Sequence, residues 1–256
     1  KSPYARSRFS YSFSIWKMQI ETTITYSQRP KHSQVFQSRF FLCEENTEPW
    51  ENCVTFTGEI DLHSKHLMTE KEKMIRGEWY MGSGAELSGE HLNSVRLCRE
   101  YNAIDPADKG KRSEILKELC PEQGDNVHIE GPFFCDYGYN IHFGNNVYIN
   151  YNCTILDVTT VTIGNDVLIG PSVEIYTAAH PVHWKQRATR IEFGKPVSIG
   201  DNVWIGGNTT ICPGVSIGDR TIIGAGSVVT KDIPDDVIAA GNPARIIKRL
   251  DAELKS

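Results

Sequence analysis

The stretch Val197-Ser198-Ile199-Gly200-Asp201-Asn202-Val203-Trp204-Ile205-Gly206 repeats one pattern every six residues, and this interval decides the fold. The same position is aliphatic six times in succession, at Ile199, Ile205, Ile211, Ile217, Ile223 and Val229. An earlier run at Ile163, Ile169 and Ile175 lies 24 residues upstream, in the same register. A period of six fits neither a helix, which repeats at about 3.6 residues, nor the two-residue alternation of a strand. It predicts short strands joined by tight turns around one apolar interior.

Three such units close one triangular coil, and stacked coils bury a continuous column of side chains. Glycines and the pairs Asn165-Asp166 and Asp201-Asn202 suit the corners, because these residues accept turn conformations that branched side chains avoid. Residues 125–233 would form about six coils. Upstream, the spacing of six continues through Ile129, Cys135, Ile141, Val147 and Cys153, and two extra residues near 157–160 interrupt it. The sequence therefore predicts a mainly β protein with a parallel β-helix over residues 125–250, whose hand the period does not reveal.

Residues 68–124 precede the repeats and predict helices. The run Glu70-Lys71-Glu72-Lys73-Met74-Ile75 favours a helix, and Gly82-Ser83-Gly84 ends it. A second helix is expected from Ser88 to Asn102 and a third from Asp108 to Leu119. The inner face of the second helix is predicted to carry Leu92, Val95, Leu97 and Cys98.

Residues 1–67 differ in composition from the rest. The first 42 residues contain seven Lys or Arg, one acidic residue and many serines, a composition typical of transit peptides. We interpret 1–67 as a disordered or mispredicted extension without a packed core. Organellar targeting by this segment is the alternative.

The overall composition excludes several classes of protein. The 256 residues carry a net charge of -5, which argues against nucleic-acid binding. No apolar run reaches the roughly 20 residues of a membrane span. Seven scattered cysteines without a Cys-x-x-Cys pair indicate reduced thiols rather than a disulfide framework or a zinc ribbon, and hence a cytoplasmic protein.

Residues 68–250 resemble the maltose and galactoside O-acetyltransferases, most closely the maltose branch. The resemblance rests on the helical stretch 69–78, the hexapeptide repeats and three further segments: Cys135-Asp136-Tyr137-Gly138-Tyr139-Asn140-Ile141, Gly194-Lys195-Pro196-Val197 and Gly241-Asn242-Pro243-Ala244-Arg245. Members of that family begin near Met68. The resemblance implies a left-handed β-helix and a homotrimer whose active sites lie between subunits.

The 24-residue interval contains an irregular stretch, Tyr176-Thr177-Ala178-Ala179-His180-Pro181-Val182-His183-Trp184. Segments that leave a regular scaffold often carry function, and an imidazole is a suitable general base near neutral pH. The motif matches the family's catalytic histidine at His180, which would take a proton from an acceptor hydroxyl. The role of His183 stays open.

The resemblance also assigns binding residues for both substrates. For the sugar acceptor it implies Asp136, Tyr148, Asn150 and Glu192. For acetyl-CoA it implies Trp204, Gly207, Ala225, Thr230, Lys231, Arg245 and Lys248; cations suit the phosphates of coenzyme A. Gly82 and His91 stand where relatives carry an acid and an arginine, which leaves the identity of the sugar open.

The predicted function is transfer of an acetyl group from acetyl-CoA to a hydroxyl of a sugar such as maltose, glucose or a galactoside, with no metal. Two alternatives use the same coil. A γ-carbonic-anhydrase-like lyase would need a third histidine, His128 or His142, beside His180 and His183, and stoichiometric zinc would support it. A non-catalytic scaffold would not bind acetyl-CoA.

Overall fold

The computed structural model describes residues 6–13, 16–24, 36–44, 54–59 and 68–250. The chain divides into two compact units, Lys1–Leu67 and Met68–Ser256. In the first unit the strands β1 (Arg6–Phe13), β2 (Trp16–Ile24), β3 (Phe36–Glu44) and β4 (Val54–Glu59) form one antiparallel sheet in chain order. That residues 1–67 are an added extension stays a prediction.

The second unit begins with a helical subdomain, as predicted. It contains α1 (Glu70–Ile75), the short strand β5 (Tyr80–Met81), α2 (Ala85–Ala103) and α3 (Lys109–Leu119). Thr69 caps α1 through a reciprocal capping box with Glu72, which satisfies backbone donors at the helix start. The prediction that Leu92 faces inward is wrong, because its side chain is 67% exposed. The buried side of α2 carries Leu97, Cys98 and Tyr101 instead.

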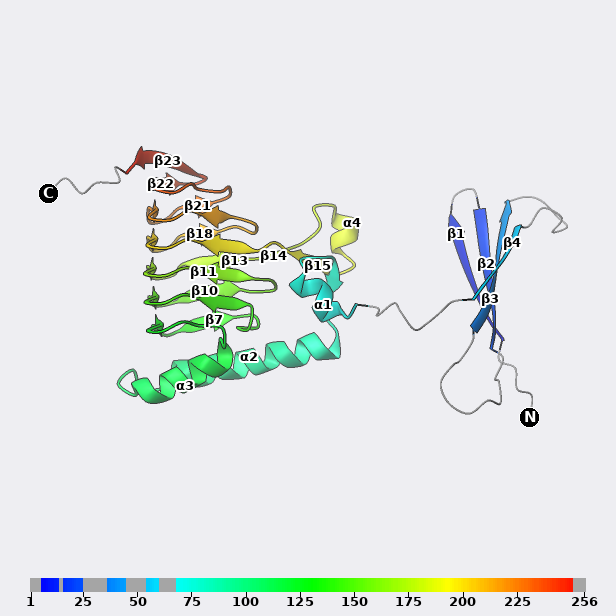
Figure 1. The fold of residues 1–256 in the computed structure, drawn as a ribbon, viewed down its shortest axis with the longest axis horizontal. Coiled ribbons are helices and arrows are strands. Elements are labelled where there is room, and N and C mark those ends of the chain that lie inside the picture. The colour runs from blue at the N-terminus through cyan, green and yellow to red at the C-terminus, as the bar shows by residue number, and fades with distance from the viewer. Residues whose placement is uncertain (1–5, 14–15, 25–35, 45–53, 60–67, 251–256) are drawn as a thin grey trace. The chain divides into compact units, whose positions relative to one another are not determined.

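A three-faced solenoid follows, in which successive short strands of the chain join three parallel sheets in turn (Figure 1). The first face contains β6 (His128–Ile129), β9 (Tyr148–Ile149), β12 (Leu168–Ile169), β17 (Trp204–Ile205), β20 (Ile222–Ile223) and β22 (Val237–Gly241), and the antiparallel β23 (Ala244–Arg249) closes its end. The second contains β7 (Phe133–Cys135), β10 (Cys153–Leu156), β13 (Glu174–Tyr176), β18 (Thr210–Ile211) and β21 (Val228–Val229). The third contains β8 (Ile141–Phe143), β11 (Val161–Ile163), β16 (Val197–Ile199) and β19 (Ser216–Ile217). The predicted parallel β-helix, preceded by helices, is confirmed.

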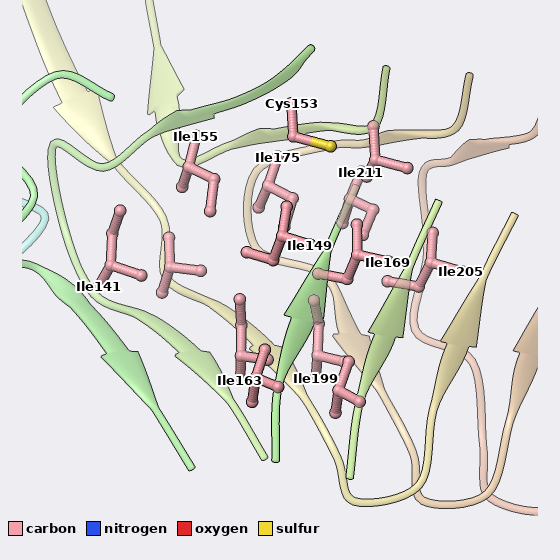
Figure 2. Close-up of a cluster of buried hydrophobic side chains, with 14 of the residues drawn as sticks. Ile141, Ile149, Cys153, Ile155, Ile163, Ile169, Ile175, Ile199, Ile205 and Ile211 are labelled. Carbon is pink, nitrogen blue, oxygen red and sulfur yellow. The ribbon is translucent and has the colours of Figure 1, made fainter. Parts of the chain in front are cut away.

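The inward aliphatic residues stack in columns (Figure 2). Ile149, Ile169 and Ile205 are direct partners along the first face, and each is at most 2% exposed. Burying one such side chain contributes roughly 1.5–3 kcal/mol. The repeated column therefore supplies most of the stabilisation that a coil without helices can obtain.

The first two coils are longer than predicted. Cys135 pairs with Ile155, and Phe143 with Ile163, so two extra residues occur at 136–140 as well as at 157–160. The predicted run through Ile141, Val147 and Cys153 is therefore out of register with the Ile163 column. The error has a simple cause: strands of the third face bury two alternate side chains, such as Val161 and Ile163 of β11, so the shifted residues still face inward.

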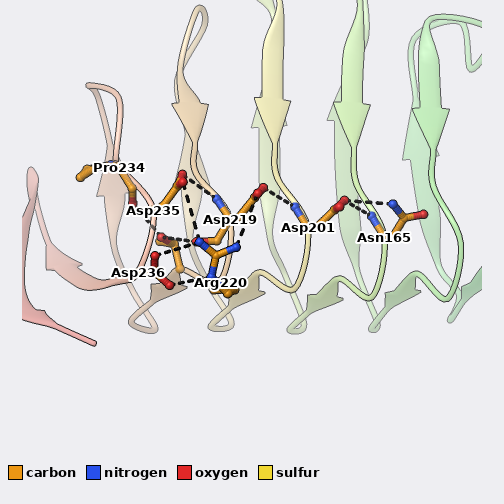
Figure 3. A network of polar contacts seen from close by, with 8 residues as sticks. Asn165, Asp201, Asp219, Arg220, Pro234, Asp235 and Asp236 are labelled. Atoms are coloured by element: carbon orange, nitrogen blue, oxygen red, sulfur yellow. Dashed lines mark hydrogen bonds and ion pairs between the residues drawn. The ribbon is translucent and has the colours of Figure 1, made fainter. Parts of the chain in front are cut away.

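A ladder of Asn and Asp side chains holds one corner together, as expected for turn residues (Figure 3). The backbone N–H of Asn165 donates to Asp201 Oδ1 at 2.7 Å, and that of Asp201 donates to Asp219 Oδ1 at 2.8 Å. The residue after each rung adopts a left-handed conformation, as at Asn202 with φ 57°. Gly200 is required beside this ladder, because a Cβ there would lie 2.2 Å from Asp219 Oδ1.

One long excursion interrupts the solenoid between β13 and β16. It forms β14 (Ala178–Ala179), α4 (Trp184–Arg187) and β15 (Ile191–Gly194). Strand β15 pairs with both β14 and β5, so the excursion is joined to the helical subdomain. No helix in the described ranges combines the length and apolar character needed to cross a bilayer.

Candidate functional site

The backbone of the excursion is held by hydrogen bonds at its base and across its tip. At the base, the buried Thr177 hydroxyl donates to Leu156 O at 2.7 Å, and Lys195 N donates to Thr177 O at 2.9 Å. At the tip, Arg187 Nη1 donates to the carbonyl oxygens of Pro181 and Val182 at 2.9 and 3.0 Å. These contacts fix the backbone on both sides of His180, which lies exposed just after β14.

His180 opens into a hollow of about 610 Å³, which we call the His180 hollow. Its lining residues are His180, Trp184, Arg187, Ala188, Arg190 and Glu192. The structure therefore brings together two residues that the sequence proposed separately, the base candidate His180 and the acceptor candidate Glu192. His183 is not among the lining residues; it precedes α4, and its ring stacks on Trp184 with 6.3 Å between centroids.

Glu192 also borders a second group of polar side chains. It is the direct strand partner of Tyr80, and a Cβ on Gly82 would lie 2.6 Å from its Oε1. Gly82 thus leaves the space that the Glu192 carboxylate occupies. The departure of Gly82 from the family pattern consequently falls at the predicted acceptor region.

Asp136 faces the same region from the solenoid. Burial raises the pKa of its carboxyl, His91 opposes that shift, and the negative charge of Glu192 adds to it. His91 Nδ1 lies 3.0 Å from the backbone oxygen of Asp136 and 3.9 Å from its Oδ1. Ionised carboxylates such as these accept hydrogen bonds, so this region suits an acceptor that carries hydroxyl donors.

Two aromatic residues in this region were not predicted. Burial raises the pKa of the Tyr80 and Tyr137 hydroxyls, and the carboxylates of Glu192 and Asp136 act in the same direction. Both hydroxyls therefore stay neutral and able to donate. Tyr137 lies inside the segment 135–141 that carried the family resemblance, and this place in the sequence could have identified it. No sequence feature identified Tyr80.

Asn150 and Tyr148 lie on the solenoid rather than in the His180 hollow. Asn150 Oδ1 accepts a hydrogen bond from Tyr151 N at 2.8 Å, as a corner asparagine does. The Tyr148 ring stacks on His128 with 5.7 Å between centroids. Neither residue lines the hollow of its own chain.

The predicted donor residues occupy the later coils and the C-terminal strands. Trp204 is 54% exposed on the first face, between its strand partners Leu168 and Ile222. Gly207 permits close coil packing, since a Cβ there would lie 2.9 Å from Pro171 O. The remaining candidates, Ala225, Thr230, Lys231, Arg245 and Lys248, are all exposed. None of the seven lines the His180 hollow of the same chain.

The described residues contain no cluster of three or more His, Cys, Asp or Glu side chains that could hold a metal ion. The five cysteines of residues 68–250 are free thiols, in agreement with the prediction.

Comparison with known proteins identifies relatives for both parts of the second unit. A family profile described as a maltose acetyltransferase hexapeptide capping motif matches residues 73–124. A second, described as bacterial transferase hexapeptide (six repeats), matches residues 196–231. The two matches correspond to the helical subdomain and to the regular coils.

Individual relatives extend over most of the second unit. The galactoside O-acetyltransferase of Escherichia coli is 42% identical over 184 residues, 72% of this chain and 91% of the relative. A crystal structure of a maltose O-acetyltransferase from Clostridium difficile is 48% identical, covers 72% of this chain and 98% of its own, and superposes with a TM-score of 0.71. A galactoside acetyltransferase solved in complex with coenzyme A is 42% identical, with a TM-score of 0.69 and coverage of 72% and 92%.

Proposed function

Because this chain belongs to the maltose and galactoside O-acetyltransferase family of hexapeptide-repeat acetyltransferases, we propose that it transfers an acetyl group from acetyl-CoA to a sugar hydroxyl with His180 as general base. One observation carries the proposal: His180 and Glu192 line the same hollow on a loop held by its own hydrogen bonds. A base and a hydroxyl-binding carboxylate in one hollow suit a polyhydroxylated acceptor.

The reaction needs one proton acceptor and no covalent intermediate on the protein. A ring nitrogen of His180 takes the proton of the acceptor hydroxyl while its oxygen attacks the thioester carbonyl. Backbone N–H groups stabilise the oxyanion of the tetrahedral intermediate. The C–S bond then breaks, and the imidazolium returns the proton to the departing thiolate. The products are an acetylated sugar and free coenzyme A.

The donor would lie along the later coils. Trp204 presents an exposed indole on the first face, and Lys231, Arg245 and Lys248 are exposed cations beyond it. Cations at these places suit the phosphates of coenzyme A, and the indole can contact the pantetheine arm.

A homotrimer completes this arrangement. The His180 hollow of one chain lacks Asn150 and the donor residues, and the apolar residues Leu168 and Trp204 are each more than half exposed on one face. A second copy packed on that face would cover the apolar surface and bring its own Asn150 and donor residues toward the hollow.

The test measures thiol release from acetyl-CoA with maltose, glucose, galactosides and amino sugars as acceptors. We expect acceptor-dependent release by the wild-type protein and none above background by His180→Ala. Absence of release with every sugar would overturn the proposed acceptor class, and equal rates for both proteins would overturn the role of His180. Stoichiometric zinc in the purified protein would favour the lyase instead.

A further inference from the structure

We propose that Asp157 is a positioning residue for the acceptor: it holds residues 136–140, the acceptor turn, so that Asp136 and Tyr137 face Glu192 beside the His180 hollow. The inference rests on the proposed function, because it assigns the turn to acceptor binding. Asp157 was not among the site residues proposed from the sequence.

The Asp157 carboxylate is the centre to which the acceptor turn is attached. Its Oδ1 accepts hydrogen bonds from Asp136 N at 3.0 Å and Tyr137 N at 2.9 Å. Its Oδ2 accepts from Gly138 N at 2.7 Å and Asn140 N at 3.4 Å. The backbone oxygen of Asp157 accepts from Asn140 Nδ2 at 2.7 Å. Four of the five backbone N–H groups in the turn therefore point at one side chain.

The carboxyl group that accepts these hydrogen bonds lies where solvent does not reach it. Asp157 is 0% exposed, and burial raises the pKa of its carboxyl to about 7, an effect that the N–H groups of Tyr137 and Gly138 oppose. Burying a carboxylate is costly unless several donors surround it. The fold accepts this cost at one place only in the described solenoid, where the turn leaves the coil.

The register explains why position 157 controls the site. Since Cys135 pairs with Ile155 and Leu156 with Tyr176, the residues that leave three successive coils lie one above another: Tyr137, Asp157 and Thr177. The turn departs below Asp157, and the His180 loop departs above it. Residues 157–160 also contact the base of the His180 loop, because Thr159 N donates to the Thr177 hydroxyl at 3.2 Å.

The turn presents its side chains to groups of three elements. Asp136 and Tyr137 face Glu192 of β15, Tyr80 of β5 and His91 of α2. Glu192 in turn lines the His180 hollow. A shift of the turn would therefore move the acceptor contacts without moving the later coils.

Asp157→Asn tests the inference, because an amide keeps the size but turns one acceptor atom into a donor that faces N–H groups. Asp201→Asn is the matched control: Asp201 accepts from Asn165 N on the corner ladder, where Asn165 itself already plays the same part. Two readouts are needed. Hydrogen–deuterium exchange follows the amides of 136–140, and steady-state kinetics give kcat/KM for the sugar and KM for acetyl-CoA separately.

In Asp157→Asn we expect faster exchange in 136–140, a fall in acceptor kcat/KM of roughly tenfold or more, and an unchanged KM for acetyl-CoA. Asp201→Asn should change none of these. Unchanged exchange, or faster exchange with unchanged acceptor kinetics, would overturn the inference, as would an equal loss toward both substrates. If Asp157→Asn does not fold, Asp157→Glu keeps the charge, displaces the turn and should raise the acceptor KM. A wild-type protein that acetylates no sugar would refute the proposed function, whereas the exchange result would still show whether Asp157 holds the turn.

Discussion

The first coils and the later coils of the solenoid are built from the same unit but differ in length. Ile129, Ile149 and Ile169 are successive strand partners 20 residues apart, whereas Ile205 and Ile223 are partners only 18 residues apart. The difference of two residues forms the acceptor turn in one coil and the Asp157 insertion in the next. Added length at a corner thus leaves the core column intact and supplies polar side chains outside it.

The two regions also bury different polar groups. In the later coils the buried polar residues are Thr209, Thr221 and Ser227, whose hydroxyls donate to nearby carbonyl oxygens. The insertions bury Asp157 and Asn140, which hold a turn. The comparison indicates that the regular coils provide stability. Under the proposed function they would also carry the donor, and the insertions would position the residues that bind the acceptor.

The largest expected effect comes from His180→Ala. Removal of a general base lowers the rate roughly 10²–10⁴-fold. Because His180 is exposed, the melting temperature should not change. His183→Ala is the matched control. His183 does not line the hollow, although its ring stacks on the lining residue Trp184, and we expect less than about a tenfold change. Acetyl transfer and thermal unfolding of both variants check this; a larger loss in the control would reverse the assignment.

A core substitution in the regular coils should affect stability instead. Ile205→Ala removes a side chain that is 0% exposed and should lower the free energy of unfolding by about 2–5 kcal/mol. Val182→Ala, at 97% exposure, should change it by less than about 0.5 kcal/mol. Chemical denaturation measures both. Equal effects would mean that the aliphatic column does not carry the stability.

A change among the donor cations should separate the two substrates. Lys231→Ala should raise the KM for acetyl-CoA by roughly tenfold, about 1.4 kcal/mol, and leave the sugar KM unchanged. Lys117→Ala removes an exposed cation from α3 and should leave both values unchanged. A rise in the sugar KM alone would contradict the division between later coils and insertions.

The smallest predicted effect is at Gly82. A Cβ there would lie 2.6 Å from Glu192 Oε1, the mobile end of a side chain, so Gly82→Ala should displace the carboxylate and raise the sugar KM roughly threefold, about 0.6 kcal/mol. Gly84→Ala is the control, because nothing lies within 4 Å of its added Cβ. Identical sugar KM values for the two variants would remove Glu192 from acceptor binding.

The period of six was sufficient to predict the solenoid, because only an inward aliphatic residue in each unit satisfies the shared core. It failed after Cys135, where Ile141 belongs to the column of Val161 and not to that of Ile163. Alternate burial within each strand makes a shift of two residues invisible in the sequence.

The candidate site was partly readable from the sequence. His180 was proposed from a motif and Glu192 from the family resemblance, and the two residues do share a hollow. The role of Asp157 could not be predicted from the sequence, because the backbone amides that it binds lie 17–21 residues away in the chain and are brought to it by coil stacking. Tyr80 reaches the region only through the pairing of β5 with β15, a contact that no local pattern encodes.

The most direct test of a site shared between copies is complementation between two inactive variants. His180→Ala and Asn150→Ala chains, denatured and refolded together in equal amounts, form mixed oligomers in which some sites take the histidine from one chain and the asparagine from the other. Random mixing should restore about a quarter of wild-type sites, although each variant alone is inactive. Activity no higher than the average of the separate variants would contradict a site completed by the neighbouring copy.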